Sequence, residues 1–544
     1  MREAKPVVFT GGPILTMAKP LRVEAITVVG DRIRCAGSLD ECRQAAGHDR
    51  EERDLGGRTL MPGFVDAHTH PLMLGQTQSW LDVGPRVAPS IPALVAVLHD
   101  RAQHLPPGVP LRAFGFDHRV TEELHEPLAS DLDVAATDRE IYVMNVSGHG
   151  GSINSFGLAA HGITAQTPDP RGGRLGRNSD GTPNGIVMDA ACDLLTGPDG
   201  VKIGNHGPNF HLPEPPDVAA EQLHSAFRMF LRAGITTVVD AQVSRRELET
   251  YIAANEAGRL GVRVNMLVIS AVLDEVLRLG LVGRLGDELL SILGIKLYAD
   301  GSLGACTAYF PHGYACDSHN HGVLYHEPDE FHALIRRAHG AGLKTATHAQ
   351  SPTAIDMVID AIEAAQSERP RPDMRHSIEH CGLPTDAEIE RIRRASIVPV
   401  SQPQHHRHFG DGVARTVGED IAQRLNPIGL YARAGIPVVL SSDAPVVLPR
   451  PLESVQAAVD RRTLNGTVLG GPELCIDVLT ALRGYTIGAA YAAHREDLVG
   501  SLEVGKLADF AVLAADPMFV PVEQLDSIAV EETWVGGRLI PRSD

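Results

Sequence analysis

Residues 60–71 read Leu-Met-Pro-Gly-Phe-Val-Asp-Ala-His-Thr-His-Pro, a short apolar run that ends in the pair His68 and His70. Residues two apart on a β-strand point to the same face, so both imidazoles would project together from the carboxyl end of this run. Two neutral imidazoles that converge in this way form half of a metal site. A pair of surface histidines has the same tripeptide, so the choice between the two interpretations depends on the sequence downstream.

That downstream sequence alternates short apolar runs with amphipathic stretches, most of which end in glycine. Counting the first run, eight such runs lie at residues 64–67, 235–240, 262–270, 293–300, 343–349, 376–381, 397–402 and 437–442. Alternating strands and helices pair in parallel, and eight units of this kind close into a (β/α)8 TIM barrel. The sequence therefore predicts an α/β fold with the barrel formed by residues 63–74 and 226–498.

The two ends of the chain have a different pattern, with short strands and turns. Strand patterns at 6–10, 25–29 and 32–36 are matched near the other end by those at 508–513, 528–535 and 538–540. Two strand-rich ends of one chain are expected to pair. We therefore predict one small β-sandwich domain formed by residues 1–62 and 499–544.

Residues 75–225 separate the first two barrel strands and are far too long for a simple loop. The segment has strand patterns of its own, at 111–117 and 141–146. We predict an inserted domain that covers the barrel mouth. Its glycine-, proline- and asparagine-rich parts, 168–185 and 199–216, are expected to be irregular and to provide a lid.

Composition narrows the class of protein. The formal net charge of −19 argues against a nucleic-acid-binding protein. Seven cysteines without Cys-x-x-Cys spacing indicate reduced thiols, which are typical of the cytoplasm. No signal-peptide pattern and no membrane-spanning apolar run is present. We expect a cytoplasmic protein that acts on a small molecule and binds neither nucleic acid nor membrane; a homodimer is left open.

Polar side chains recur at the carboxyl ends of the predicted barrel strands, where active sites of such barrels lie. Besides the histidine pair, these residues are Lys296, His348, His380 and Asp443. A core histidine with a satisfied hydrogen bond would explain His348 or His380 alone, and a helix N-cap would explain Asp443. Six such residues in order around one barrel favour a single shared site.

Lys296 lies inside an apolar strand, where a lone ammonium is costly and the neutral amine is favoured. A neutral lysine amine can react with CO2 to form a carbamate, an anionic ligand whose two oxygens two metal ions can share. A lysine that extends to the barrel rim is the alternative interpretation.

Several motifs of the chain resemble those of the amidohydrolase superfamily, in particular the YtcJ-like (amidohydrolase 3) branch, which includes N-substituted formamide deformylases. They cover nearly the whole chain and are Pro-Gly-Phe-Val-Asp-Ala-His-Thr-His at 62–70, Ser-Gly-His-Gly-Gly-Ser-Ile-Asn-Ser at 147–155, Gly-Thr-Pro-Asn-Gly at 181–185, Lys-Leu-Tyr-Ala-Asp-Gly-Ser-Leu-Gly at 296–304, Arg-His-Ser-Ile-Glu-His at 375–380, Ser-Asp-Ala-Pro at 442–445 and Gly-Ser-Leu-Glu-Val-Gly-Lys-Leu-Ala-Asp at 500–509.

The resemblance implies a binuclear metal site and a metal-dependent hydrolase that acts on non-peptide carbon–nitrogen bonds. One cation would be held by His68, His70, the Lys296 carbamate and Asp443, and the other by the carbamate, His348 and His380. Zn2+ suits these ligands, with Mn2+, Fe2+ or Co2+ as alternatives. Asp443 would act as general acid and base in the hydrolysis of an amide, an N-substituted formamide or a cyclic amide.

Four further residues are candidates for substrate binding: His149, Asp300, Gln402 and His405. Asp300 shares the face of Lys296 and would position substrate or orient a ligand, or it is a turn residue. Gln402 and His405 follow the seventh strand, although residues 405–408 equally suit a solvated loop. His149 lies between glycines that allow close approach, or in a plain loop.

The chain departs from the pattern of the branch in two places. His348 is not followed by Gly-Asp-Arg, and position 189 is aspartate where glutamate is commoner. Neither change touches a proposed ligand, but both bear on substrate specificity. The sequence also leaves open a mononuclear deaminase- or isomerase-like enzyme, a non-catalytic regulatory relative and a phosphoester hydrolase, although no Arg/Lys cluster suited to phosphate is evident near the proposed site.

Overall fold

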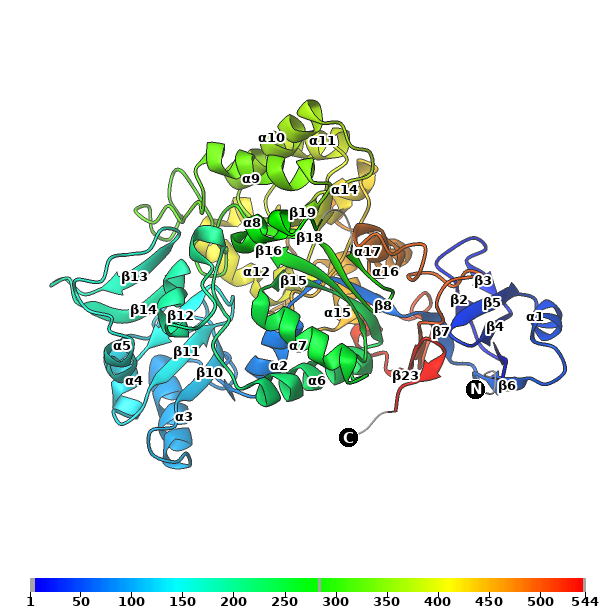
Figure 1. The fold of residues 1–544 in the computed structure, drawn as a ribbon, viewed down its shortest axis with the longest axis horizontal. Coiled ribbons are helices and arrows are strands. Elements are labelled where there is room, and N and C mark those ends of the chain that lie inside the picture. The colour runs from blue at the N-terminus through cyan, green and yellow to red at the C-terminus, as the bar shows by residue number, and fades with distance from the viewer. Residues whose placement is uncertain (1–4, 282–284, 542–544) are drawn as a thin grey trace.

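Seven parallel strands form the central sheet in a computed structural model that describes residues 5–281 and 285–541 (Figure 1). In sheet order these are β8 (Phe64–Thr69), β15 (Ile235–Val243), β16 (Arg263–Ile269), β18 (Leu290–Tyr298), β19 (Lys344–Ala349), β20 (Ser377–His380) and β21 (Val398–Val400). Each neighbouring pair is parallel. The predicted α/β TIM-barrel fold is confirmed.

The eighth predicted strand, 437–442, is not a regular strand in the structure. It contacts the seventh through a single parallel bridge between Ser401 and Leu440. On its other side, the carboxylate of Asp66 in β8 accepts hydrogen bonds from the backbone N–H of Ser442, at 3.0 Å, and from the Ser442 hydroxyl, at 2.6 Å. A side chain therefore replaces part of the strand ladder, and the barrel closes without a full eighth strand.

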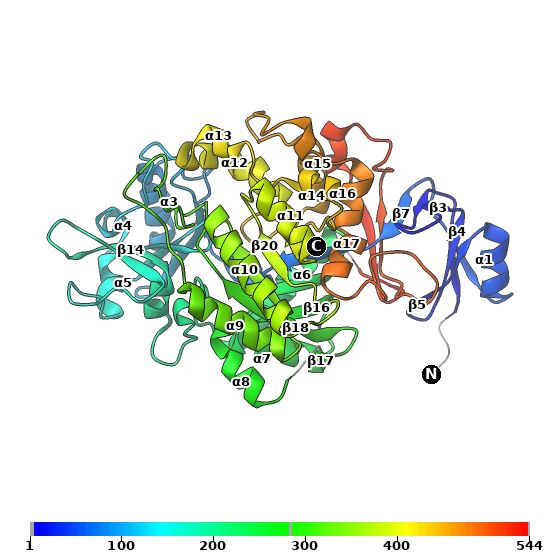
Figure 2. The same cartoon turned by 90° about the horizontal axis from the view of Figure 1, so that it is seen from above.

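Helices cover the outer face of this barrel (Figures 1 and 2). The helices of the barrel region are α2 (Pro71–Gln78), α6 (Pro216–Arg232), α7 (Arg245–Glu256), α8 (Leu273–Arg278), α9 (Pro328–Gly340), α10 (Pro352–Glu368), α11 (Asp386–Arg394), α12 (Pro403–Val417), α13 (Glu419–Ala422), α14 (Ile428–Arg433), α15 (Pro451–Asp460), α16 (Val478–Gly484) and α17 (Ile487–Ala492). Ile295 and Leu297 of β18 share an apolar cluster with Phe331 and Ile335 of α9. Because strand side chains alternate, Lys296 between them faces the barrel interior.

The segment 75–225 forms a separate sheet at one end of the molecule (Figure 1). Its strands, in sheet order, are β13 (Gly173–Arg177), β14 (Pro183–Asp189), β12 (Gly150–Ile153), β11 (Ile141–Asn145), β10 (Leu111–Phe116) and β9 (Leu81–Asp82). Its helices are α3 (Ile91–Gln103), α4 (Ala129–Ala135) and α5 (Ser155–Ala160).

The prediction that 168–185 is irregular was wrong, because β13 and β14 form a hairpin there. Its turn is closed by a 2.8 Å bond from Asn178 N to Thr182 O and includes Gly181 at φ +85°. This turn explains why a stretch rich in glycine and asparagine still forms two strands. The second stretch, 199–216, is largely irregular, with the short turn η2 (Gly204–His206). Its role as a lid remains a prediction.

The chain ends build two sheets at the opposite end of the molecule from the inserted segment (Figures 1 and 2). One contains β5 (Arg32–Gly37), β4 (Ala25–Val29), β1 (Val7–Thr10) and β6 (Glu51–Asp54), and the other contains β24 (Arg538–Leu539), β23 (Val530–Val535), β22 (Phe510–Leu513), β7 (Thr59–Pro62), β2 (Ile14–Leu15) and β3 (Arg22–Val23). The rings of Phe9, Phe510 and Trp534 pack between the sheets. The exact domain boundaries remain predictions.

Within residues 5–281 and 285–541, none of the helices combines the length and the apolar character needed to cross a membrane.

Candidate metal centre

The six residues predicted as metal ligands meet at one end of the barrel. Their side chains come from β8, β18, β19, β20 and the two segments that follow β8 and the eighth strand position, and all six are buried. Five of them line one cavity: His68, His70, His348, His380 and Asp443. Lys296 lies beside this cavity, since its Nζ is 4.5 Å from the ring centroid of Tyr298, which lines it.

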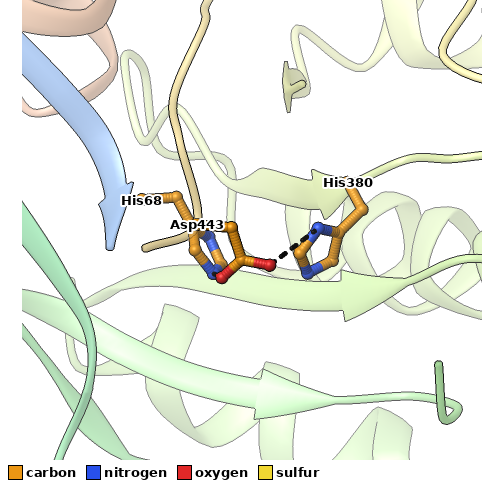
Figure 3. A group of neighbouring side chains, drawn as sticks. All are labelled: His68, His380 and Asp443. Atoms are coloured by element: carbon orange, nitrogen blue, oxygen red, sulfur yellow. Dashed lines mark ion pairs between the residues drawn. The ribbon is translucent and has the colours of Figure 1, made fainter. Parts of the chain in front are cut away.

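Asp443 lies between His68 and His380 (Figure 3). Its Oδ1 is 3.4 Å from Nε2 of His68 and 3.3 Å from Nε2 of His70, while its Oδ2 is 3.9 Å from Nδ1 of His380. One ligand atom each from His68, His380 and Asp443 all lie within 4.8 Å of one another. The His348 ring is 4.5 Å from the His380 ring, centroid to centroid. These spacings suit donors that converge on cations.

The ionisation of His70, His348, His380 and Asp443 also suits a cation. Burial lowers the pKa of His70 to about 4, although Asp443 opposes this, and burial places the pKa values of His348 and His380 well below the usual range. Burial alone would raise the pKa of Asp443, but hydrogen bonds from His68 and His70 hold that pKa well below its ordinary value. Neutral imidazoles and an ionised carboxylate are the protonation states that bind divalent metals.

Two side chains behind the cluster fix the orientation of its imidazoles. Glu379 Oε2 lies 2.5 Å from Nδ1 of His68, and Gln402 Oε1 lies 2.8 Å from Nδ1 of His380. The Ser377 hydroxyl holds the other oxygen of Glu379 at 2.5 Å. With Nδ1 engaged in each ring, Nε2 is the atom left for a cation, as is usual when carboxylates and carbonyl oxygens support ligand histidines.

The unpartnered amine of Lys296 tests whether the predicted carbamate fits. Its Nζ is fully buried and makes no hydrogen bond to any described residue. Burial lowers the pKa of Lys296 to about 8, while Glu379 and Asp443 act in the opposite direction. A buried donor without a partner is rare. An anionic group on this nitrogen, facing cations, would remove the mismatch, so the residues present fit the predicted metal site.

Two of the proposed ligands also have a strained backbone. His380 and Asp443 have φ values of +68° and +63°, in the left-handed region that side chains other than glycine seldom adopt. Each sits where a strand position ends and the chain turns into the cavity. Strained backbone of this kind gathers at functional sites, where the surrounding structure holds it in place.

Of the four predicted substrate-binding residues, His405 lies in the cavity wall. It belongs to α12, not to a solvated loop, and its Nε2 is 3.5 Å from Oδ2 of Asp443. Gln402 is not part of the lining and instead holds His380 from behind. Gln402 therefore does not occupy the expected position in the pocket. Its amide oxygen instead contacts the His380 ring on the side away from the cavity.

Asp300 also lies away from the cavity lining. Its carboxylate accepts backbone N–H bonds from Gln350 at 2.9 Å, and from Ser351 and Tyr309 at 3.1 Å. These bonds fix the chain that leaves β19, so Asp300 supports the position of His348. The expected substrate contact is not found at this residue, whereas the orienting role agrees with its contacts.

His149 reaches the cavity from the inserted segment. Its Nδ1 lies 2.9 Å from Oδ1 of Asp189, which also accepts a 2.6 Å bond from the Tyr325 hydroxyl. The His149 ring is 5.3 Å from that of His348. Asp189, the residue that departs from the branch pattern, therefore orients a histidine that faces the metal ligands.

Two residues of this region escaped the sequence analysis, Glu379 and Arg119. The position of Glu379 inside a barrel strand could have indicated its role. A buried carboxylate is costly unless it has a hydrogen-bond or ion-pair partner. Arg119 follows β10 and lines the cavity, with Asp117 two residues before it. A charged pair directly after a buried strand was the available signal there.

The chain was compared with known proteins. Residues 51–541 match the model of the family described as "Amidohydrolase family". The chain is 30% identical to an N-substituted formamide deformylase of Arthrobacter pascens, over 95% of this chain and 94% of that protein. It is 28% identical to YtcJ of Bacillus subtilis (strain 168), over 98% of this chain and 99% of that protein. A crystal structure of an uncharacterized metal-dependent hydrolase from Pyrococcus furiosus is 26% identical, covers 94% of this chain and all of its own (100%), and superimposes with a TM-score of 0.72. The predicted resemblance is confirmed: this chain belongs to the amidohydrolase family.

Proposed function

We propose that the protein is a metal-dependent hydrolase of a non-peptide carbon–nitrogen bond, in an amide, an N-substituted formamide or a cyclic amide. The observation that carries the proposal is the buried cluster of His68, His380 and Asp443, extended by His70 and His348, on one cavity wall. The similarity to a deformylase over nearly the full length of both chains supports the bond type.

The ligands divide into two sets. His68, His70, Asp443 and the modified Lys296 would hold one cation, and His348, His380 and the modified Lys296 the other, with Zn2+ best suited to the nitrogen and oxygen donors. When bound, such cations polarise a carbonyl group and lower the pKa of water towards neutrality. Glu379 and Gln402 keep His68 and His380 in position.

The modification of Lys296 is a simple addition. The neutral amine forms a new N–C bond to CO2, one C–O π bond opens, and the nitrogen releases one proton to solvent, which leaves a carbamate with a single negative charge. Its formation requires the unprotonated amine that burial of Lys296 favours.

Asp443 would move the proton. Its ionised carboxylate lies among His68, His70 and His405 and lines the cavity, so it can accept a proton from the attacking water. The same carboxyl group then delivers this proton to the leaving nitrogen as the carbon–nitrogen bond breaks. Both transfers would be made at this one side chain, whose left-handed backbone is maintained by the surrounding structure.

A single-metal enzyme is the second candidate. Among the described residues, the group that meets the spacing of a metal site contains three members, His68, His380 and Asp443. One bound cation per chain and an unmodified lysine would favour a mononuclear, deaminase-like reaction. Two cations per chain and extra mass on the peptide of Lys296 would favour the binuclear hydrolase.

The test is a substrate screen of metal-loaded protein against matched panels of N-formyl amines, N-acyl amines, lactams and carboxylic esters. We expect release of amine from at least one amide panel, abolished by a chelator and restored by Zn2+. Turnover that survives complete removal of metal, or activity confined to esters, would contradict the proposal.

A further inference from the structure

Arg119 places a buried guanidinium in the wall of the cavity. Its positive charge is opposite in sign to that of the Asp443 carboxylate, which lines the same cavity. It lies in the loop after β10 of the inserted segment, lines the cavity and is only 3% exposed. Nothing in the proposed hydrolysis uses this residue. A buried arginine normally has a hydrogen-bond acceptor for each of its N–H groups. An N–H group without an acceptor therefore indicates a missing partner.

The guanidinium is only partly satisfied by the protein. Asp117 accepts from Nε at 2.7 Å and from Nη2 at 2.8 Å, in the two-pronged arrangement that fixes the plane of the group. The remaining nitrogen, Nη1, is buried and has no hydrogen-bond partner among the described residues. Asp117 therefore acts as a rigid holder that leaves Nη1 free for a ligand.

The side chains of Ser147 and Ser302 adjoin the same small volume as this free nitrogen. A methyl group placed on Gly304 would be 3.3 Å from Ser302 Oγ, 3.4 Å from Ser147 Cβ and 3.5 Å from Arg119 Nη1, so one small volume adjoins all three side chains. The Ser147 and Ser302 oxygens accept backbone N–H bonds at 3.2 Å and 3.0 Å. Neither hydroxyl donates a hydrogen bond to another described residue, so each keeps its hydrogen for an acceptor.

The charges around the cavity favour an anion at this place. Asp443 is the one carboxylate among the described residues that line the cavity, and it belongs to the metal cluster. The guanidinium nitrogen and the two hydroxyls can each donate a hydrogen bond here, which suits a group that only accepts. A carboxylate has two oxygens and fits the paired geometry that arginine prefers.

A short chain of contacts links the recess to the metal ligands. Phe409 lies between them: its ring is 5.0 Å from Cζ of Arg119 and 5.8 Å from the His405 ring. His405 in turn lies 3.5 Å from Asp443. Arg119, Phe409, His405 and Asp443 line one cavity, so a single small molecule can contact both the recess and the metal ligands.

We propose that Arg119, with Ser147 and Ser302, binds a carboxylate of the substrate, so that the preferred substrates are N-formyl or N-acyl amino acids. This inference rests on the proposed hydrolysis for its reaction and on the Arg119 recess for its specificity. Arg119 is a binding residue that selects the substrate, and it takes no part in proton transfer.

The test uses substrate pairs that differ only in the carboxylate, such as N-formylphenylalanine and N-(2-phenylethyl)formamide. We expect kcat/KM of the protein for the acid to exceed that for the neutral partner by at least about tenfold, mainly through KM, because a charge-assisted hydrogen bond typically contributes a factor of this size or more. In Arg119→Gln this preference should fall by about ten- to a hundredfold.

Arg119→Gln leaves Asp117 without its partner, so two further variants keep the result interpretable. Asp117→Asn with Arg119→Gln removes both charges together. Gly304→Ala keeps the Arg119–Asp117 pair and fills the recess with a methyl group, and Gly304 has no left-handed φ that would strain alanine. Both should lose the preference for the acid. Arg112→Gln is the matched control, because Arg112 pairs with Glu140 at 2.6 Å in the same segment and does not line the cavity.

The outcomes separate the inference from the proposed hydrolysis. Equal kcat/KM for acid and neutral substrates, unchanged in the recess variants, would overturn the inference while the hydrolase stands. If neither substrate is cleaved, calorimetry of N-formylphenylalanine with metal-loaded protein decides on the recess: binding that Gly304→Ala weakens at least about tenfold supports carboxylate binding there. Absence of binding overturns the inference, while the hydrolysis itself is decided by the substrate panel.

Discussion

The cavity has two walls that come from different parts of the chain. The first, the barrel wall, consists of His68, His348, His380 and Asp443 at strand ends. The second, the inserted wall, includes Arg119 and His149 in loops of residues 75–225. The barrel wall carries the ligands that fit cations, and the inserted wall carries groups that fit an organic substrate. Under the proposed function the barrel wall carries the chemistry, and selectivity depends on the inserted wall together with Ser302 and Gly304 in the loop after β18, which agrees with barrels that vary specificity through their loops.

The contrast has a physical basis. Parallel strands place their carboxyl ends at one rim, so residues at those ends meet whatever the rest of the chain does. Residues in loops of an insertion meet the site only if the insertion docks against the barrel. We therefore expect changes in the barrel wall to affect metal content and turnover of every substrate, and changes in the inserted wall to affect the choice of substrate.

The largest expected effect is that of Asp443→Asn. The amide cannot accept the proton of the attacking water, so kcat should fall by about a thousandfold for all substrates. Steady-state kinetics with metal-saturated enzyme checks this. Asp477→Asn, at the exposed N-cap of α16, is the control and should keep normal kcat. Turnover within about threefold of the original protein in Asp443→Asn would remove its role as general base.

Lys296→Met should abolish activity and lower metal content, because the bridging ligand is lost. It should also leave the thermal stability of metal-free protein unchanged or raise it, because it removes a buried amine without a partner. Calorimetry and elemental analysis check the two effects.

Lys344 supplies the matched control for this pair of measurements. It is also buried and its pKa is also lowered to about 8 by burial, but its Nζ donates to the Arg375 carbonyl oxygen. Lys344→Met should therefore reduce thermal stability, because it leaves that carbonyl unpaired, and should keep the metal content. Normal metal content in Lys296→Met together with loss of metal in Lys344→Met would refute the carbamate on Lys296.

Glu379→Gln addresses the support behind the barrel wall. Its charge-assisted bond to His68 is weakened, so metal affinity should fall by about ten- to a hundredfold while kcat of metal-saturated enzyme falls less. Titration with a competing chelator measures this. Glu388→Gln changes a buried capping glutamate of α11 and should leave affinity alone. Unaltered affinity in Glu379→Gln would show that His68 needs no carboxylate support.

The smallest expected effect in the series is that of His149→Gln in the inserted wall. We expect kcat/KM to fall by about tenfold, the loss typical of one hydrogen bond to a substrate, with metal content unchanged. The comparison of kinetics with elemental analysis separates the two walls. A loss of metal in this variant would make His149 a part of the metal centre and erase the contrast.

The sequence predicted the barrel wall well because its signals are local. His68 and His70 two residues apart, Lys296 in an apolar strand and His380 at a strand end each follow from strand alternation. The eighth strand was predicted as regular because its composition is apolar, yet the buried carboxylate of Asp66 takes the place of ladder bonds. The composition of residues 437–442 does not reveal that a side chain of another strand, Asp66, will take their hydrogen bonds.

Of the inserted wall, the sequence predicted His149 but not Arg119, because the signal for Arg119 is not local. The free nitrogen of Arg119 and the adjacent recess at Gly304 depend on contacts between segments almost 200 positions apart, and no local pattern encodes them. Gln402 was expected to line the pocket because it follows a barrel strand, and Asp300 was expected to position substrate or orient a ligand because it shares the face of Lys296. In the structure the Asp300 carboxylate accepts from backbone amides, and the Gln402 side chain contacts the His380 imidazole. Sequence spacing cannot distinguish these contacts from contacts with substrate.

The most direct test of the metal centre is elemental analysis of the protein after removal of metals and reloading with Zn2+, alongside the double variant His68→Ala with His380→Ala. We predict about two zinc ions per chain in the original protein and fewer than about half an ion in the double variant, since each cation loses a ligand. Equal zinc in both proteins, or none in either, would contradict the assignment of this cluster as the metal site.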